Sequence, residues 1–301
     1  MIKDGEPFFV CPPDGQIPLD GAHGFGLYHH DTRFLEGYEL RILDVAPDCL
    51  AATAAAGTSA ILELTNPEIH LENGRTIGKD RLAIRWTRAL EGDRAELLDT
   101  IAVRNSDVDD VTLTMRVEVA ASFRDVFEVR GLLKAPRGSV HKPAWNDAGL
   151  VFASAGRDRV RRTLTATFDP APSEREEAGA TVELAVPGRG SATLEIRLRI
   201  GEQVEPGAAP IERRSPSSTA RSRPSPLAVG RPHGGWVGGD GWATAVRTNA
   251  FLFDAVVGRS RDDLVLLRGE LDGRRYYVAG LPWFSTLFRR RPAGRPRGSA
   301  A

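Results

Sequence analysis

A short segment near the N-terminus concentrates the side chains that most often carry chemistry. Between Gly26 and Leu35 the sequence reads Gly-Leu-Tyr-His-His-Asp-Thr-Arg-Phe-Leu, which combines imidazole, carboxylate, guanidinium and hydroxyl groups. A metal site would need three or four converging ligands. On a strand, His29 and Asp31 share one face while His30 points to the other, so the segment alone offers too few. We therefore expect no metal and no cofactor here.

Two other interpretations of this segment remain open. A nucleophilic triad is disfavoured because the sequence places no Ser or Cys in an elbow motif. The alternative is structural: Asp31 and Arg33, two apart on one strand, would form a half-buried ion pair that fixes a corner of the sheet. Judged from the residues alone, the structural interpretation is favoured.

A second candidate lies near the C-terminus, where an apolar and aromatic run occupies residues 276–288. Trp283 and Phe284, with Tyr276 and Tyr277 before them, offer flat faces on which sugar rings stack. Ordinary packing of a Pro-Trp-Phe corner is the competing interpretation, and spacing alone favours it. The run resembles the entrance to a further domain.

Composition narrows the classes of partner. Of 301 residues, 41% are hydrophobic, which supports a packed core, and 40 basic residues balance 40 acidic ones. Zero formal charge gives no overall attraction to nucleic acid or anionic lipid. Arginine-rich residues 289–301 lack interleaved aromatics and are more typical of a disordered tail than of a phosphate-binding surface.

The sequence also predicts a compartment. Cys11 and Cys49 are the two cysteines, too few for a disulfide framework and without the spacing of a zinc or redox motif. The N-terminus lacks the apolar core of a signal peptide, and no run approaches the roughly 18 apolar residues of a membrane span. We expect a cytoplasmic protein with no membrane and no nucleic-acid partner.

Residues 1–200 have the pattern of β-strands. In Asp110–Ala120, apolar residues from Val111 to Val119 alternate with polar ones, which gives a strand one buried and one solvated face. Residues 81–88 and 194–200 repeat this alternation. Weaker strands are expected at 24–28, 38–43, 60–64, 98–104, 150–154, 163–168 and 181–186. Many strands with turns between them and no amphipathic helices predict an all-β fold, a large antiparallel β-sandwich.

The pattern changes after residue 200. Residues 201–245 are rich in Pro, Arg and Gly and are expected to be a linker or a misread segment. Residues 246–288 are expected to be helical at first, with Thr248 capping a helix from Asn249 to about Arg268. Residues 289–301 would be a disordered tail.

These residues resemble a known family. Gly26-Leu27-Tyr28 followed by Asp31-Thr32-Arg33-Phe34-Leu35 resembles the start of the N-terminal domain of bacterial-type glycogen debranching enzymes, which are amylo-α-1,6-glucosidase-like proteins. Asp263-Leu264-Val265-Leu266-Leu267 and the run 279–288 resemble the junction to the catalytic domain of those proteins. The resemblance implies a supersandwich-like β-domain whose helical segment begins an (α/α) toroid, absent from this sequence.

The resemblance assigns no catalytic residue to this chain. Where the family continues Gly-Arg-Asp-Ser, this sequence has Arg289-Arg290-Arg291-Pro292, and the family's catalytic carboxylates lie further on in the toroid. The run of residues 211–241 also departs from the family pattern. We interpret the chain as truncated at the start of its catalytic domain, with shifts of reading frame as a hypothesis for both departures.

The implied function is that of the N-terminal domain of a glycogen-debranching glycoside hydrolase that acts on α-glucans such as glycogen or maltooligosaccharides and is inactive alone. Its partner would be the missing catalytic domain. Tyr28, Asp31 and Arg33 would brace or line the substrate cleft, and Trp283 and Phe284 would form part of its wall. The alternative is a non-catalytic carbohydrate-binding module; an arginine-tail nucleic-acid binder is the weakest hypothesis.

Overall fold

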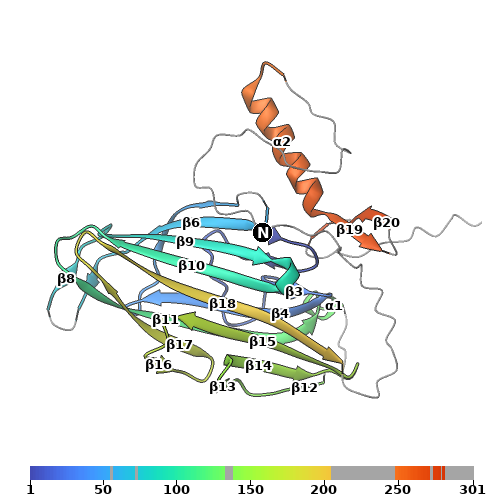
Figure 1. The fold of residues 1–301 in the computed structure, drawn as a ribbon, viewed down its shortest axis with the longest axis horizontal. Helices are drawn as coiled ribbons and strands as arrows, with labels where there is room; N and C mark the ends of the chain where they lie inside the picture. The colour runs from blue at the N-terminus through green and yellow to red at the C-terminus, as the bar shows by residue number, and fades with distance from the viewer. Residues whose placement is uncertain are drawn as a thin grey trace, which may run out of the picture.

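The computed structural model describes residues 1–54, 57–71, 74–132, 138–204, 248–271, 274–278 and 280–281. Within them, two large antiparallel sheets lie face to face, as the all-β prediction requires (Figure 1). The first sheet has seven strands, in the order β1 (Ile2–Lys3), β2 (Phe8–Val10), β3 (Gly26–His29), β4 (Thr32–Ile42), β11 (Val111–Asp125), β17 (Gly179–Val186) and β16 (Glu174–Arg175).

The second sheet has nine strands. Its order is β12 (Ser139–Val140), β14 (Gly149–Ala155), β15 (Val160–Asp169), β18 (Ser191–Val204), β10 (Glu96–Asn105), β9 (Leu82–Glu91), β6 (Ser59–Thr65) and β5 (Asp48–Thr53), with β13 (Ala144–Asn146) beside β14. The remaining strands among the described residues form two small ribbons, β7 (Ile69–His70) with β8 (Thr76–Ile77), and β19 (Arg268–Leu271) with β20 (Arg274–Tyr277). The helical elements are η1 (Gly92–Arg94), α1 (Val126–Val129) and α2 (Phe251–Leu266).

Alternation along the strands builds the core between the sheets. In β11, Val111, Leu113, Met115, Val117 and Val119 are all buried. The neighbouring strand β17 contributes in the same way, and its buried Val182 pairs in register with Met115. Because side chains on a strand alternate between faces, each apolar row turns inward while its polar neighbours remain at the surface.

Every strand that the sequence predicts is present, with different ends. The expected strand 38–43 is the second half of β4, which begins at Thr32, and β18 continues to Val204 beyond the predicted boundary at residue 200. The sequence missed short edge strands such as β1, β7 and β16. Two or three residues carry too little alternation to be recognised, and their pairing depends on a neighbouring strand.

Helix α2 confirms the predicted helix but not its cap. It runs from Phe251 to Leu266, and its N-cap residue Ala250 makes no side-chain cap bond. The hydroxyl of Thr248 instead donates to Asp254 Oδ1 at 2.8 Å and accepts from the Ala250 amide at 3.1 Å. None of its residues is buried, so no face of the helix packs into a core within the described residues. It stands apart from the sandwich (Figure 1).

Contact between α2 and the sandwich is slight. Arg259 Nη1 donates to the carbonyl oxygen of Ala54 at 2.7 Å, and the Leu266 side chain lies close to Gly57. Among the described residues, no helix has the length and apolar character needed to cross a membrane. Of the predicted linker, residues 201–245, the first four belong to β18 and residues 205–245 lie outside the described residues, as does the predicted tail, residues 289–301.

Candidate functional site

A tight turn between β3 and β4 positions the chemically richest segment. His30 and Asp31 both have positive φ, 45° and 58°, as a type I′ hairpin turn requires. His and Asp tolerate this region better than most side chains, although each still carries strain. The Val126 amide at the start of α1 donates to the Asp31 carbonyl oxygen at 2.8 Å and holds the turn in place.

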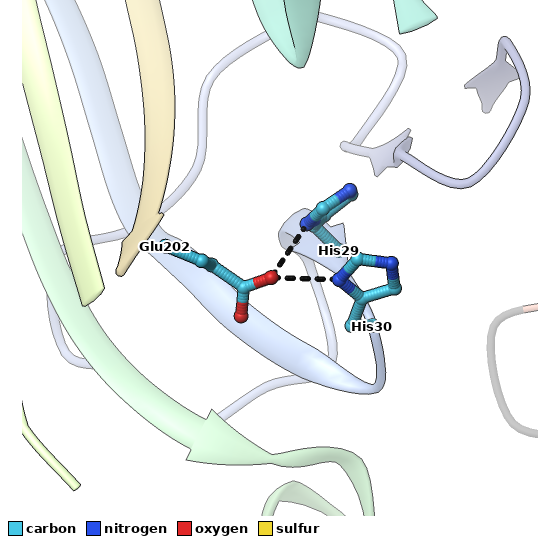
Figure 2. Close-up of side chains that lie close together, drawn as sticks. All are labelled: His29, His30 and Glu202. Atoms are coloured by element: carbon cyan, nitrogen blue, oxygen red, sulfur yellow. Dashed lines mark hydrogen bonds and ion pairs between the residues drawn. The ribbon is translucent and has the colours of Figure 1, made fainter. Parts of the chain in front are cut away.

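The turn brings two imidazoles to one carboxylate (Figure 2). His30 Nδ1 donates to Glu202 Oε2 at 2.7 Å, and His29 Nδ1 lies 3.4 Å from the same oxygen. The two rings lie with centroids 3.8 Å apart. The prediction that His30 points away from His29 is wrong, because the chain reverses at His30 and the strand alternation ends there.

Glu202 comes from the other sheet, near the end of β18. Its register partner on β15 is Arg162, whose Nε lies 3.4 Å from Glu202 Oε1. Two further nitrogens of Arg162 bond to the Asp158 carboxylate at 2.6 and 3.2 Å. One oxygen of Glu202 therefore faces the guanidinium and the other faces the imidazoles. The cluster links the ends of the two sheets.

Electrostatics keep this carboxylate ionised. Burial favours a raised pKa for Glu202, but the two imidazoles outweigh burial and hold its pKa well below the usual range. The side chains of Glu202 and His29 are only 15% and 14% exposed, and that of His30 is 27% exposed. The result is a half-buried anionic group beside two nitrogen ligands, a set that can bind a cation or hold a proton.

Tyr28 and Arg33, predicted to brace or line a cleft, are fully buried. Tyr28 stacks on Phe8 at a centroid distance of 4.8 Å and donates its hydroxyl to the Gly24 carbonyl oxygen at 2.9 Å. Burial raises the pKa of Tyr28 to about 12 against the opposing charge of Arg33. In this structure the two side chains occupy bracing positions.

Arg33 forms its ion pair with Glu36, at 2.6 Å, rather than with Asp31 as the structural interpretation expected. Its guanidinium also donates to the carbonyl oxygens of Gly21 and His23. Asp31 lies in the hairpin turn and is exposed. The reversal of the chain at residues 30–31 separates the two side chains that a continuous strand would have placed on one face.

The aromatic run predicted at residues 276–288 is described only in part. Trp283 and Phe284 lie outside the described residues. Tyr277 is 49% exposed at the end of β20, and burial raises the pKa of Tyr276. The structure therefore leaves the proposed aromatic wall of a sugar cleft as a prediction.

Sequence reasoning missed a buried ion pair. Arg88 and Asp99 are both about 1% exposed and bond in a bidentate arrangement at 2.8 and 2.7 Å. The guanidinium lies between the rings of Phe9 and Trp86 and donates to the Gly15 carbonyl oxygen at 3.1 Å. Burial opposes this charge, but Asp99 raises the pKa of Arg88 overall.

Arg88 also borders a partly open hollow of about 230 Å³. Met1, Ile2, Cys11 and Leu62 are among its other lining residues, and its lining shares no residue with the His29–His30–Glu202 cluster. Apolar side chains dominate its wall, and no carboxylate is among the described residues that line it. Alternation predicted that residues 81–88 form a strand, but the pairing of Arg88 with Asp99 depends on the register of β9 with β10, which no local sequence signal indicates.

Comparison with known families decides the class of this domain. A model of the N-terminal domain of some glycogen debranching enzymes matches residues 2–197. The chain belongs to this family. The glycogen debranching N-terminal family is related to glycoside hydrolases, and its matched span contains His29 and His30 but ends before Glu202. The resemblance first seen in the Gly26–Leu35 segment is confirmed.

Structural comparisons are more distant. A protein described as a kojibiose phosphorylase from the human microbiome matches with a TM-score of 0.41 and 8% identity over 66% of this chain and 26% of that one. A heparinase III gene product matches with a TM-score of 0.28 and 9% identity over 55% of this chain and 24% of that one. The same gene product with methylated lysines matches with a TM-score of 0.33 and 9% identity over 67% of this chain and 32% of that one. The chain thus spans a third or less of each, and no curated protein matches its sequence.

Proposed function

We propose that this chain serves as the non-catalytic N-terminal domain of an amylo-α-1,6-glucosidase-type debranching hydrolase that acts on α-glucans. The match of residues 2–197 to the glycogen debranching N-terminal family carries the proposal. Hydrolysis of an α-1,6 bond would use a pair of carboxylates on a separate catalytic domain. The β-sandwich would support that domain and help to shape its substrate cleft.

Helix α2 supports a protein partner. Its side chains include Phe251, Leu252, Phe253 and Val256, which are 74%, 76%, 52% and 63% exposed. Apolar groups gathered on one short element and left open to water are typical of an interaction surface. A catalytic domain packed against this helix would remove them from water, as interfaces between domains of one enzyme do.

The bracing positions of Tyr28 and Arg33 fit a supporting domain. Both side chains are buried and bonded to the carbonyl oxygens of the 21–24 loop, so they fix the corner of the sheet. A glycosidase site needs accessible carboxylates at a set separation. Within the described residues, the two buried carboxylates are engaged by arginines, Asp99 by Arg88 and Glu96 by Arg197 and Arg199. The half-buried Glu202 is engaged by His30 and Arg162.

The alternative is a module that binds carbohydrate by itself. Native electrophoresis through gels with and without glycogen separates the two proposals, with dextran gels as the polymer control. A supporting domain is expected to migrate equally in all three gels and to release no glucose from a phosphorylase-limit dextrin. Selective retardation by glycogen would favour the binding module, and glucose release by the chain alone would refute a non-catalytic role.

A further inference from the structure

We propose that His29, His30 and Glu202 form a binding site for a single transition-metal ion of the zinc class. The two histidines come from the β3–β4 hairpin turn of one sheet, and the glutamate comes from the end of β18 in the other (Figure 2). Their ligand atoms all lie within 4.8 Å of one another. The inference is independent of any role in glucan hydrolysis.

The spacing suits a small tetrahedral ion. Zinc bonds of 2.0–2.2 Å place neighbouring ligand atoms about 3.3 Å apart. His29 Nδ1 and Glu202 Oε2 are already 3.4 Å apart. His30 Nδ1 lies 2.7 Å from the same oxygen, so this hydrogen bond must open by about 0.6 Å to admit an ion of that size. A change of side-chain torsion accommodates such a shift.

One nitrogen of the cluster, His29 Nδ1, lacks a hydrogen bond. His29 Nδ1 is buried and has no hydrogen-bond partner, since 3.4 Å with unfavourable geometry falls short of a bond to Glu202. A buried polar nitrogen without a partner carries a desolvation cost. A metal ion between the two side chains would satisfy this nitrogen, and neutral imidazole is the form that binds metals.

Neighbouring groups orient the carboxylate for this role. Arg162 lies beside Oε1, and Asp158 engages the same guanidinium, so Oε2 is left facing the imidazoles. Such outer partners are what fix metal ligands in position. The strained left-handed backbone of His30 and Asp31 places two consecutive imidazoles on the same side of the chain. Strain of this kind gathers at functional sites.

The donor set indicates the class of ion. Two nitrogens and one oxygen favour zinc or a similar transition metal over calcium or magnesium, which prefer oxygen ligands. Three protein ligands at a half-buried position leave a fourth coordination site open to water or a small anion. The ion would also link the two sheets, because its ligands come from both.

Zinc titration of the untagged, metal-stripped full chain tests the site. Calorimetry should show binding near one ion per chain, and cobalt(II) should develop the visible absorption of a four-coordinate N/O site. His30→Asn and Glu202→Gln should each weaken zinc binding more than about tenfold, since even outer partners change metal affinity by that much. Asn tolerates the positive φ of residue 30.

His70→Asn is the matched control, because His70 also lies beside a glutamate, at 3.5 Å from Glu68, but is exposed. It should bind zinc like the parent chain. The circular dichroism of each variant verifies its fold, and His29→Asn replaces either ligand variant that fails to fold. Absence of zinc binding by the parent chain, or undiminished binding by folded Glu202→Gln, would overturn the proposal.

Discussion

At the scale of single residues, the burial of Tyr28 should make the stability of the protein depend on pH in the alkaline range. The pKa of Tyr28 is raised from 10.0 to about 12 by burial, so the folded state resists ionisation of the phenol. The stability from this residue is complete below pH 10 and is lost as the pH rises towards 12, by up to about 1.4 kcal/mol per pH unit. Tyr28→Phe should flatten this loss, measured as the urea midpoint between pH 9 and 11. An equal slope in both proteins would contradict the assignment.

The buried Arg88–Asp99 pair should matter far more than its exposed counterpart. Arg88→Met leaves Asp99 buried without its partner, and about 3–5 kcal/mol of unfolding free energy should be lost. Arg85→Met breaks the exposed pair with Glu63, at 2.7 Å, and should cost less than about 1 kcal/mol. Urea unfolding measures both. Similar losses for the two variants would mean that burial does not set the strength of the Arg88 pair.

At the scale of elements, the β3–β4 hairpin explains why its motif begins with glycine. Gly26 has a φ of +146°, and a Cβ there would lie 2.1 Å from the Leu35 carbonyl oxygen and 3.0 Å from Arg33 Cδ. That φ is essentially restricted to glycine. The backbone at Gly26 therefore packs directly against Leu35 and Arg33 of the same motif.

Gly26→Ala should therefore destabilise the sandwich by several kcal/mol, about 2–4, through strain and a backbone clash. Gly5→Ala is the control, because Gly5 also has positive φ, +60°, but its added Cβ would meet nothing within 4 Å. Its cost should be only about 1–2 kcal/mol. Thermal unfolding would compare them, and equal losses would show that backbone conformation alone, without the clash, accounts for the effect.

Prediction from sequence succeeded where a local period exists. The alternation from Val111 to Val119 predicted β11, and the Gly26–Leu35 motif predicted the family. It failed where distant segments meet. The contact of His29 and His30 with Glu202 was not predictable, because the position of Glu202 beside Arg162 follows from strand register. The chain reversal at His30, which places the two imidazoles on one side, was not predictable from strand alternation either.

At the scale of the whole molecule, stability should be uneven. Strand β10 lies between β9 and β18 and carries buried Leu97, Ile101 and Val103, whereas α2 has no buried residue. Hydrogen exchange should therefore be slowest in β10 and fast in α2, whose opening costs little apolar burial. Mass spectrometry of peptic fragments would measure this order. Protection of α2 equal to that of β10 would show that the helix is held by contacts that this structure lacks.

The proposed role of this sandwich is to support catalysis that another domain supplies. The direct test uses a debranching-enzyme catalytic domain, produced without its own sandwich, from a protein whose N-terminal domain belongs to the same family. Glucose release from a phosphorylase-limit dextrin is measured with that domain, with this chain, and with both. We expect no glucose release by this chain alone and a higher kcat/KM for the mixture than for the catalytic domain. Release by this chain alone, or an unchanged rate for the mixture, would contradict the proposed role.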